Sequence, residues 1–250
     1  MPPALKALAI DFAPPHSHSL MSTTSQPVAP WRAGIQGARA NLVPGLVLQA
    51  FALALVLGYY FVPSVTEALA RWTVWRDRLG VSYSMASTAL FGAIIPWIYL
   101  RFVPATRHRY NVKQGFGLAL FWAYKGWEMH WLYTGLAHFV GYDNSISTIA
   151  QKVVLDQFVY APLLAAPGMW LGYQWVETHF NIRQVWAQFR SRGWFYEKLL
   201  PIMIANIGIW LPTVAIIYAL PLPLQLPLEN LVLCFFTLML AHLSQQRATA

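Results

Sequence analysis

No charged residue occurs between Arg39 and Glu67, and the segment LVPGLVLQAFALALVLGYYFV fills most of this stretch. A helix needs about 20 consecutive apolar residues to cross the hydrocarbon core of a bilayer. A second uncharged stretch, between Arg78 and Arg101, also meets this requirement. Within lipid the backbone must satisfy its own hydrogen bonds, and the short alternating segments of a barrel are absent from the sequence. The sequence therefore predicts an integral membrane protein built from helices.

The composition excludes the main soluble classes. Of the 250 residues, 57% are hydrophobic and 10% are charged, whereas a soluble domain carries about 25% charged residues. The single cysteine, Cys234, excludes an intrachain disulfide scaffold. A net charge of +8 would indicate nucleic-acid binding in a soluble protein. In a membrane protein it reflects Lys and Arg retained on one side of the bilayer, so we expect lipid and not nucleic acid as the partner.

Four further apolar segments complete the predicted domain, and they cover residues 114–140, 148–173, 199–220 and 228–243. A capping box of Thr148 and Gln151 predicts the start of the fourth helix, and the run PLPLQLP at 221–227 ends the fifth. The last segment is short, so it either spans or is partly interfacial. We predict an all-α polytopic bundle with a flexible tail at 1–40 and one transmembrane domain at 41–245. About six membrane segments are expected, the alternative being roughly four to five spans with interfacial helices.

The distribution of Lys and Arg predicts the orientation. With six spans, the termini and the loops at 101–113 and 177–198 share one side, which holds twelve basic residues against three on the other side. This bias places both termini inside. The first 40 residues lack the apolar core of a secretory signal, and Met21 opens a second plausible start. We expect a multi-pass protein of a bacterial plasma membrane or of a mitochondrial inner or peroxisomal membrane.

Polar side chains at membrane depth are the candidate functional residues, because a charged group there costs about 2.5–3.5 kcal/mol on insertion scales. Lys125 and Glu128 are three residues apart, so they can form an ion pair on one helix face. His130 points to nearly the opposite side of that helix. Lys152 and Asp156 are four residues apart and therefore also share a face.

Two amides extend this set: Gln157 lies beside Asp156, and Asn206 lies about a third of the way along the fifth helix. Two interpretations remain open for the charged groups. They either lock helices together or line a polar pathway for ions or small solutes. For Asn206 and His130 structural hydrogen bonding is favoured. A membrane enzyme that uses His130 with Glu128 or Asp156 as acid and base is a third, weaker possibility.

No metal-ligand pattern, nucleophile elbow or glycine-rich phosphate loop occurs in the sequence. We therefore predict neither a metal site nor a cofactor, and no enzymatic activity. Gly168 and Gly172 form a GxxxG pattern that seats a neighbouring helix closely, either within the chain or in a homo-oligomer or membrane-protein complex. Pro212 predicts a kink in the fifth helix.

Three short segments carry a family resemblance. Gly126-Trp-Glu-Met-His130-Trp-Leu-Tyr133 resembles the signature G-P-x-x-H-x-x-Y. Lys152-Val-Val-Leu-Asp156-Gln157-Phe-Val-Tyr160-Ala161-Pro162 resembles K-x-x-x-D-Q-x-x-x-x-P. Trp194 and the segment Pro201 to Pro212 resemble W-P-x-x-x-x-x-N-F-x-x-x-P. In this order the segments resemble the Mpv-seventeen family, which includes the twenty-two-kilodalton peroxisomal membrane protein.

The resemblance covers roughly residues 107–243 and implies a small helical membrane protein with channel-like, weakly selective conductance. The family positions that it matches are His130, Tyr133, Lys152, Asp156, Gln157, Pro162 and Asn206. We expect channel-like permeation of small solutes or ions through a polar bundle interior. The alternative is a structural or assembly subunit of a membrane complex with no transport activity.

Overall fold

A computed structural model describes residues 29–102 and 111–249, and this part of the chain is helical and contains no strand. The α-helices are α2 (Pro30–Ala40), α3 (Leu42–Phe61), α4 (Pro63–Leu79), α5 (Val81–Ala89), α6 (Ile95–Phe102), α7 (Val112–Val140), α8 (Ile146–Leu155), α9 (Ala166–Glu177), α10 (Ile182–Phe189), α11 (Leu200–Tyr218) and α12 (Leu222–Thr249). Three π-helical segments continue them: η1 (Leu90–Ile94), η2 (Asp156–Ala165) and η3 (Phe195–Leu199).

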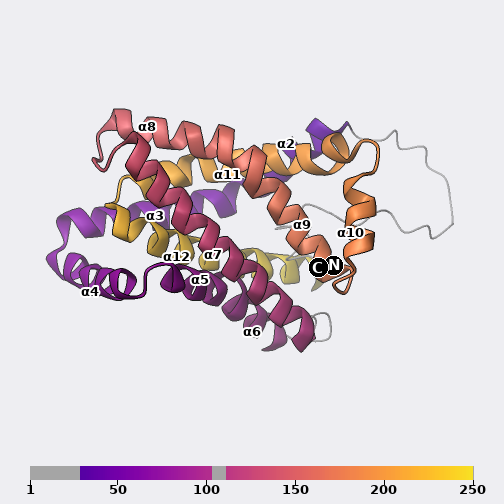
Figure 1. Cartoon of the computed structure of the whole chain (residues 1–250), viewed down its shortest axis with the longest axis horizontal. Helices are drawn as coiled ribbons and strands as arrows, with labels where there is room; N and C mark the ends of the chain where they lie inside the picture. The colour runs from indigo at the N-terminus through magenta and orange to yellow at the C-terminus, as the bar shows by residue number, and fades with distance from the viewer. Residues whose placement is uncertain (1–28, 103–110, 250) are drawn as a thin grey trace.

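The helices form an elongated bundle (Figure 1). Helix α3 runs to one end, the run from α4 to α6 returns to the other, and α7 crosses back over the front of the bundle. The run of α8, η2 and α9 then returns along the top edge, α10 stands across the end, and α11 and α12 complete the layer behind. The described chain thus alternates between the two ends of the bundle.

Three of the described helices are long and apolar enough to cross a membrane, judged by length and composition: Leu42–Phe61, Val81–Phe102 and Phe195–Tyr218. They coincide with the first, second and fifth predicted segments. A shorter apolar helix covers Leu222–Leu238. The generic prediction of a helical membrane protein is therefore supported.

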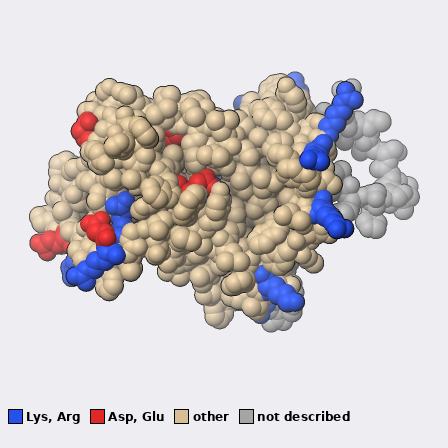
Figure 2. Space-filling view, viewed as in Figure 1, with Lys and Arg blue, Asp and Glu red and all other residues tan. Residues whose placement is uncertain are grey.

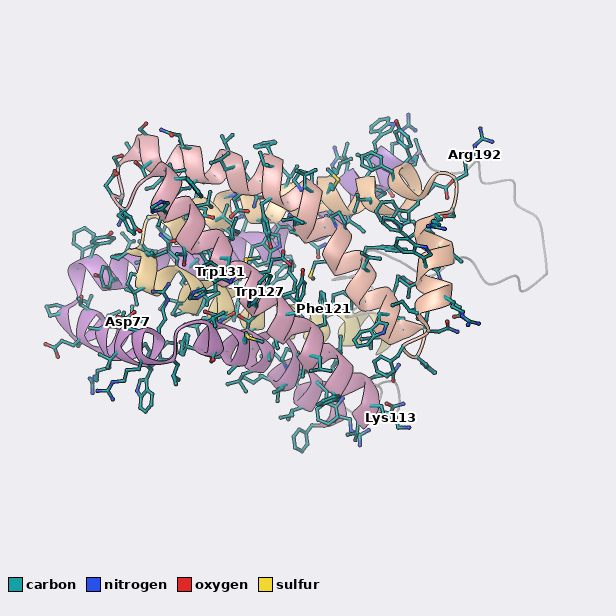
Figure 3. All side chains as sticks on the ribbon, viewed as in Figure 1. Asp77, Lys113, Phe121, Trp127, Trp131 and Arg192 are labelled. Atoms are coloured by element: carbon teal, nitrogen blue, oxygen red, sulfur yellow. The ribbon has the colours of Figure 1, made fainter. Side chains whose placement is uncertain are left out.

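The surface has the charge pattern of such a protein. On the face in Figure 2, basic and acidic side chains gather at the two ends, and the broad middle is uncharged apart from a few acidic atoms. Asp77 lies at one end, and Lys113 and Arg192 lie at the other (Figure 3). The exposed face of α3 is apolar and includes Leu42, Val43, Leu46, Val47, Leu53 and Leu57. An apolar surface of this extent needs lipid or protein to cover it.

Several predicted boundaries differ from the structure. Ser145, not Thr148, is the N-cap of α8, because its hydroxyl accepts a hydrogen bond from the Thr148 amide at 3.3 Å. Helix α12 begins at Leu222 and so includes most of the run that was expected to end the fifth helix. Proline is tolerated in the first turn of a helix, where the amide groups have no partner within the helix, and this explains how Pro223 fits there.

Three helices were not predicted: α2, α4 and α10, of which α10 lies in the predicted loop at 177–198. Residues 30–40, in the range assigned to the tail, form α2, whereas the predicted tail before residue 29 lies outside the described residues. The segment Pro63–Leu79, which lies between the first two predicted membrane segments, forms α4. Pro63 opens α4 at a position that favours proline, and Gly80, with φ of 53°, ends it. None of the three is a long apolar run, so hydropathy does not indicate them.

Helices α5 and α7 approach each other closely at Gly126. A Cβ atom at this position would collide with the carbonyl oxygen of Ser84 and lie 2.9 Å from the Cα atom of Met85. Glycine is therefore required if the two backbones are to keep this spacing. The close approach fixes the face of α7 that turns toward the interior.

Candidate functional site

Four helical segments direct polar side chains into the centre of the bundle. The residues are Lys125, Glu128 and Tyr133 of α7, Asp156, Gln157 and Tyr160 of η2, Tyr218 of α11 and Glu229 of α12. π-Helical segments often occur at functional sites, and η2 supplies three members of this set. The interior centre thus contains residues from predicted segments three, four, five and six.

The first part of the centre is an ion pair. Lys125 Nζ lies 2.5 Å from Glu128 Oε1, as the spacing of three residues predicts. Tyr160 joins both groups, since Lys125 Nζ donates to its hydroxyl at 3.1 Å and the hydroxyl donates to Glu128. Lys125 and Glu128 are 2% and 8% exposed, so water does not solvate this pair from outside the bundle.

The second part of the centre is the Asp156 carboxylate. Tyr218 donates to Oδ2 at 2.6 Å, and Gln157 Nε2 donates to Oδ1 at 3.0 Å. Among the described residues no ion pair joins Asp156 to Lys152, although both were expected on one face. Lys152 is buried and interacts electrostatically with Asp143, before the start of α8. Asp156 instead interacts electrostatically with Lys125.

Glu229 of α12 is a member of the centre that the sequence analysis missed. Tyr133 hydrogen-bonds to its carboxylate, which also interacts electrostatically with Asp156 and Lys125. A predicted helix start at Leu228 placed Glu229 at the membrane surface. Because α12 begins at Leu222, Glu229 lies about 10 Å along the helix. A lone carboxylate this far inside an apolar helix is the signal that could have identified it.

A cavity of about 140 Å³ lies beside these groups. Its polar lining includes Lys125, Asp156, Gln157, Asn206 and Glu229. Its apolar lining includes Trp122, Met129, Met169, Tyr173, Ile209, Trp210, Leu233 and Phe236. An apolar cavity of about 150 Å³ is large enough for benzene. The space is therefore sufficient for several water molecules or one small organic molecule.

His130 belongs to a different polar cluster. Its Nδ1 atom lies 3.1 Å from Ser84 Oγ on α5, on the side of α7 that faces away from Glu128. The cluster continues to α12, where Asn230 Nδ2 donates to Ser87 Oγ at 3.0 Å and Asn230 Oδ1 accepts from Thr88 Oγ1 at 3.0 Å. These bonds connect α5 to α7 and α12, and His130 takes part in them and not in the central cluster.

Asn206, for which structural hydrogen bonding was favoured, lies at the wall of two cavities. It lines the main cavity and a second cavity of about 10 Å³ between η2 and α11. No hydrogen bond connects its side chain to another described residue. Asn230, in contrast, links α12 to α5 through its amide, and Asn206 faces the space between η2 and α11.

Of the two glycines predicted to pack against another helix, one makes a close contact and the other does not. A Cβ atom at Gly172 would collide with the Phe121 ring, whereas one at Gly168 would meet no described atom within 4 Å. Only the second glycine of the GxxxG pattern therefore seats a side chain from α7. Pro162 lies within η2 and Pro212 within α11, and neither ends its helix.

The turn between α7 and α8 carries an exposed carboxylate, Asp143. It accepts hydrogen bonds from the Ser145 amide at 2.9 Å and the Thr148 hydroxyl at 3.0 Å. These bonds stabilise the charged form and lower the pKa of Asp143 to about 2. The side chain holds the start of α8 in place together with the Ser145 cap.

Among the described residues, no three His, Cys, Asp or Glu side chains converge in a way that could hold a metal ion. The geometry instead offers a cavity with carboxylate, amide and ammonium groups on an otherwise apolar wall. Comparison of the chain with protein-family models, with curated proteins and with solved structures finds no match.

Proposed function

We propose that this chain is a multi-pass membrane protein of about six spans, with both termini on the more basic side of the membrane. Helix α7 and the run from α8 to α9 have too low a mean hydropathy to be recognised by apolar composition. Their charged residues in the middle of the bundle, including Lys125, Glu128 and Asp156, are buried against other helices. Since these groups do not face lipid, their charge is compatible with spanning segments.

We propose further that the bundle interior permits channel-like permeation of small solutes or ions, as the resemblance to the Mpv-seventeen family implies. The observation that carries this proposal is the cavity of about 140 Å³ with Lys125, Asp156 and Glu229 on its wall. Ionisable groups within membrane segments typically mark pathways for ions or substrates. The cavity supplies the space that a permeating species needs beside such groups.

The test is to reconstitute the purified full-length chain in planar bilayers and to record currents. We expect currents above those of protein-free bilayers, and we expect Asp156→Asn to change the conductance or the ion selectivity. Asp77→Asn, which alters an exposed carboxylate at the end of the bundle, is the matched control. Absence of current, or a conductance that Asp156→Asn leaves unchanged, would overturn the proposal.

A second candidate function is that of a structural subunit of a membrane complex. It is favoured by the degree to which the central groups satisfy one another: Tyr160 with the Lys125–Glu128 pair, and Tyr218 with Asp156. In this case Asp156→Asn lowers the unfolding temperature or removes a co-purifying membrane protein. A stable Asp156→Asn variant that retains every partner would exclude this second function.

A further inference from the structure

We propose that the central cavity binds a small organic cation, a primary ammonium with a short alkyl chain. This inference rests on the proposed function and assigns a substrate class to its pathway. It follows from three features of the cavity: two acceptor oxygens without a hydrogen-bond partner, an excess of carboxylates over cations, and a mainly apolar wall that encloses enough space for a small organic molecule.

Two acceptor atoms of the cavity lining have no hydrogen-bond partner among the described groups, Gln157 Oε1 and Glu229 Oε2. Gln157 is only 3% exposed, so bulk water does not serve its oxygen. Its amide orientation is fixed because Nε2 donates to the Asp156 carboxylate at 3.0 Å. Reversing the amide would bring two acceptor oxygens together. Both oxygens therefore lack a donor, and a buried acceptor without a donor is costly. Trp122 Nε1 in the same lining is a donor without an acceptor.

The charges of the central residues also favour a cationic ligand. The centre contains one cation, Lys125, and three carboxylates, Glu128, Asp156 and Glu229, a formal balance of −2 (1 − 3). Lys125 is paired directly with Glu128. Asp156 and Glu229 receive hydrogen bonds from neutral groups, namely phenols and an amide. A ligand that is both positively charged and a hydrogen-bond donor complements these two carboxylates.

The apolar and aromatic part of the cavity lining favours an organic cation over a metal ion. Trp122, Trp210 and Phe236 contribute aromatic surface to the cavity, and aromatic faces attract ammonium groups. The volume of about 140 Å³ exceeds what a dehydrated inorganic ion fills. In the part of the chain that the structure describes, no metal-ligand set is assembled. An alkyl chain would occupy the apolar part of the cavity, and its ammonium group would supply the donor that Gln157 Oε1 or Glu229 Oε2 lacks.

The test measures binding of three probes of equal length to the full-length protein in detergent: n-butylammonium, n-butanol and butyrate. Equilibrium dialysis is suitable for all three. We expect n-butylammonium to bind about tenfold or more tightly than n-butanol, a difference of about 1.4 kcal/mol, and butyrate to bind weakest. Equal binding of n-butylammonium and n-butanol, tighter binding of butyrate, or no binding of any probe would overturn the inference.

Variants of cavity residues distinguish the effect of carboxylate charge on probe binding from the effect of cavity size. Glu229→Gln should reduce the preference for n-butylammonium over n-butanol, whereas Glu67→Gln on α4, outside the cavity lining, should leave it unchanged. Ala205→Leu narrows the cavity and should weaken both probes. If Glu229→Gln does not fold, Gln157→Leu removes an unpartnered acceptor without changing the charge and should lower the same preference. A preference that Glu229→Gln or Gln157→Leu leaves intact would place the cation elsewhere and overturn the inference.

The conductance measurement distinguishes the proposal of channel-like permeation from the proposal that the cavity binds an organic ammonium ion. If bilayers conduct but n-butylammonium does not bind in preference to n-butanol, permeation stands and the substrate class is wrong. If n-butylammonium binds with the expected preference but no current is recorded with either this cation or inorganic salts, the cavity is a binding site and the channel proposal is wrong.

Discussion

Lys125 and Glu128 form a buried ion pair within one turn of α7, with 2.5 Å between Nζ and Oε1. Tyr160 of η2 hydrogen-bonds to both partners, so the pair also connects two helices. The exposed side of α7 carries the rings of Trp127 and Trp131, which lie on the outside of the bundle (Figure 3). One helix therefore separates a charged interior from an aromatic exterior.

The ion pair predicts an asymmetry between single and double variants. Lys125→Met leaves Glu128 buried without its cation, and loss of one partner of a buried pair costs about 3–5 kcal/mol. Replacing both residues, in Lys125→Met/Glu128→Leu, should recover most of that loss because no unpaired charge remains. The measurement is thermal unfolding in detergent, followed by circular dichroism.

Lys113→Met, at the exposed start of α7, is the matched control and should change the unfolding temperature little. The ion pair would have no structural importance if Lys125→Met unfolded at the same temperature as this control. Equal destabilisation of the single and double variants would show that packing, and not the unpaired carboxylate, determines the loss.

Regular spacing predicted this pair because both partners lie on one helix, where a separation of three residues fixes their relative direction. The same rule placed His130 on another side of α7, and its Ser84 contact agrees. Tyr160 and Tyr218 were not predicted to contact the carboxylates, since such contacts depend on how separate helices pack. Residue spacing along one sequence does not reveal which residues of separate helices come into contact.

The three most apolar segments were also predictable, because length and hydropathy alone define them. Glu229 was missed for a different reason. The predicted start of its helix was six residues too late, and an error at a helix end changes the apparent depth of every residue near it. Gly168 shows the opposite error, since its pattern predicts a close contact that only Gly172 makes.

The contact of Gly126 with α5 predicts a strong dependence on side-chain size. Gly126→Ala places a methyl group against the Ser84 carbonyl oxygen, so the two backbones must separate, and such overpacking typically costs about 1–3 kcal/mol. Gly135→Ala is the control on the same helix, because a Cβ atom there meets no described atom within 4 Å. It should be neutral or stabilise α7 by up to about 1 kcal/mol.

Both glycine variants are compared by unfolding temperature in the same detergent. If Gly126→Ala is as stable as Gly135→Ala, α5 and α7 do not approach each other as closely as the structure indicates.

The two asparagines predict opposite outcomes for the same substitution. Asn230→Ala breaks the bonds to Ser87 and Thr88 and leaves the buried Thr88 hydroxyl without a partner, which costs about 1–3 kcal/mol. Asn206→Ala removes an amide that faces a cavity and has no hydrogen bond to a described residue, so its effect on stability should be smaller. Chemical or thermal unfolding of the two variants in parallel tests this. A greater loss in Asn206→Ala would restore to Asn206 the structural role that the sequence suggested.

Asp143 predicts a pH dependence of stability at the start of α8. Hydrogen bonds lower its pKa from 3.8 to about 2 in the folded state, so the folded chain holds the charged form more strongly than the unfolded chain. Its contribution is complete above about pH 4 and disappears as the pH falls through about 2. Asp143→Asn cannot titrate, so its unfolding temperature should fall less over this interval than that of the wild type. Asp77→Asn serves as the control for general acid effects and should follow the wild type. Parallel curves for the wild type and Asp143→Asn from about pH 5 to about pH 2 would show that the turn does not hold the carboxylate in its charged form.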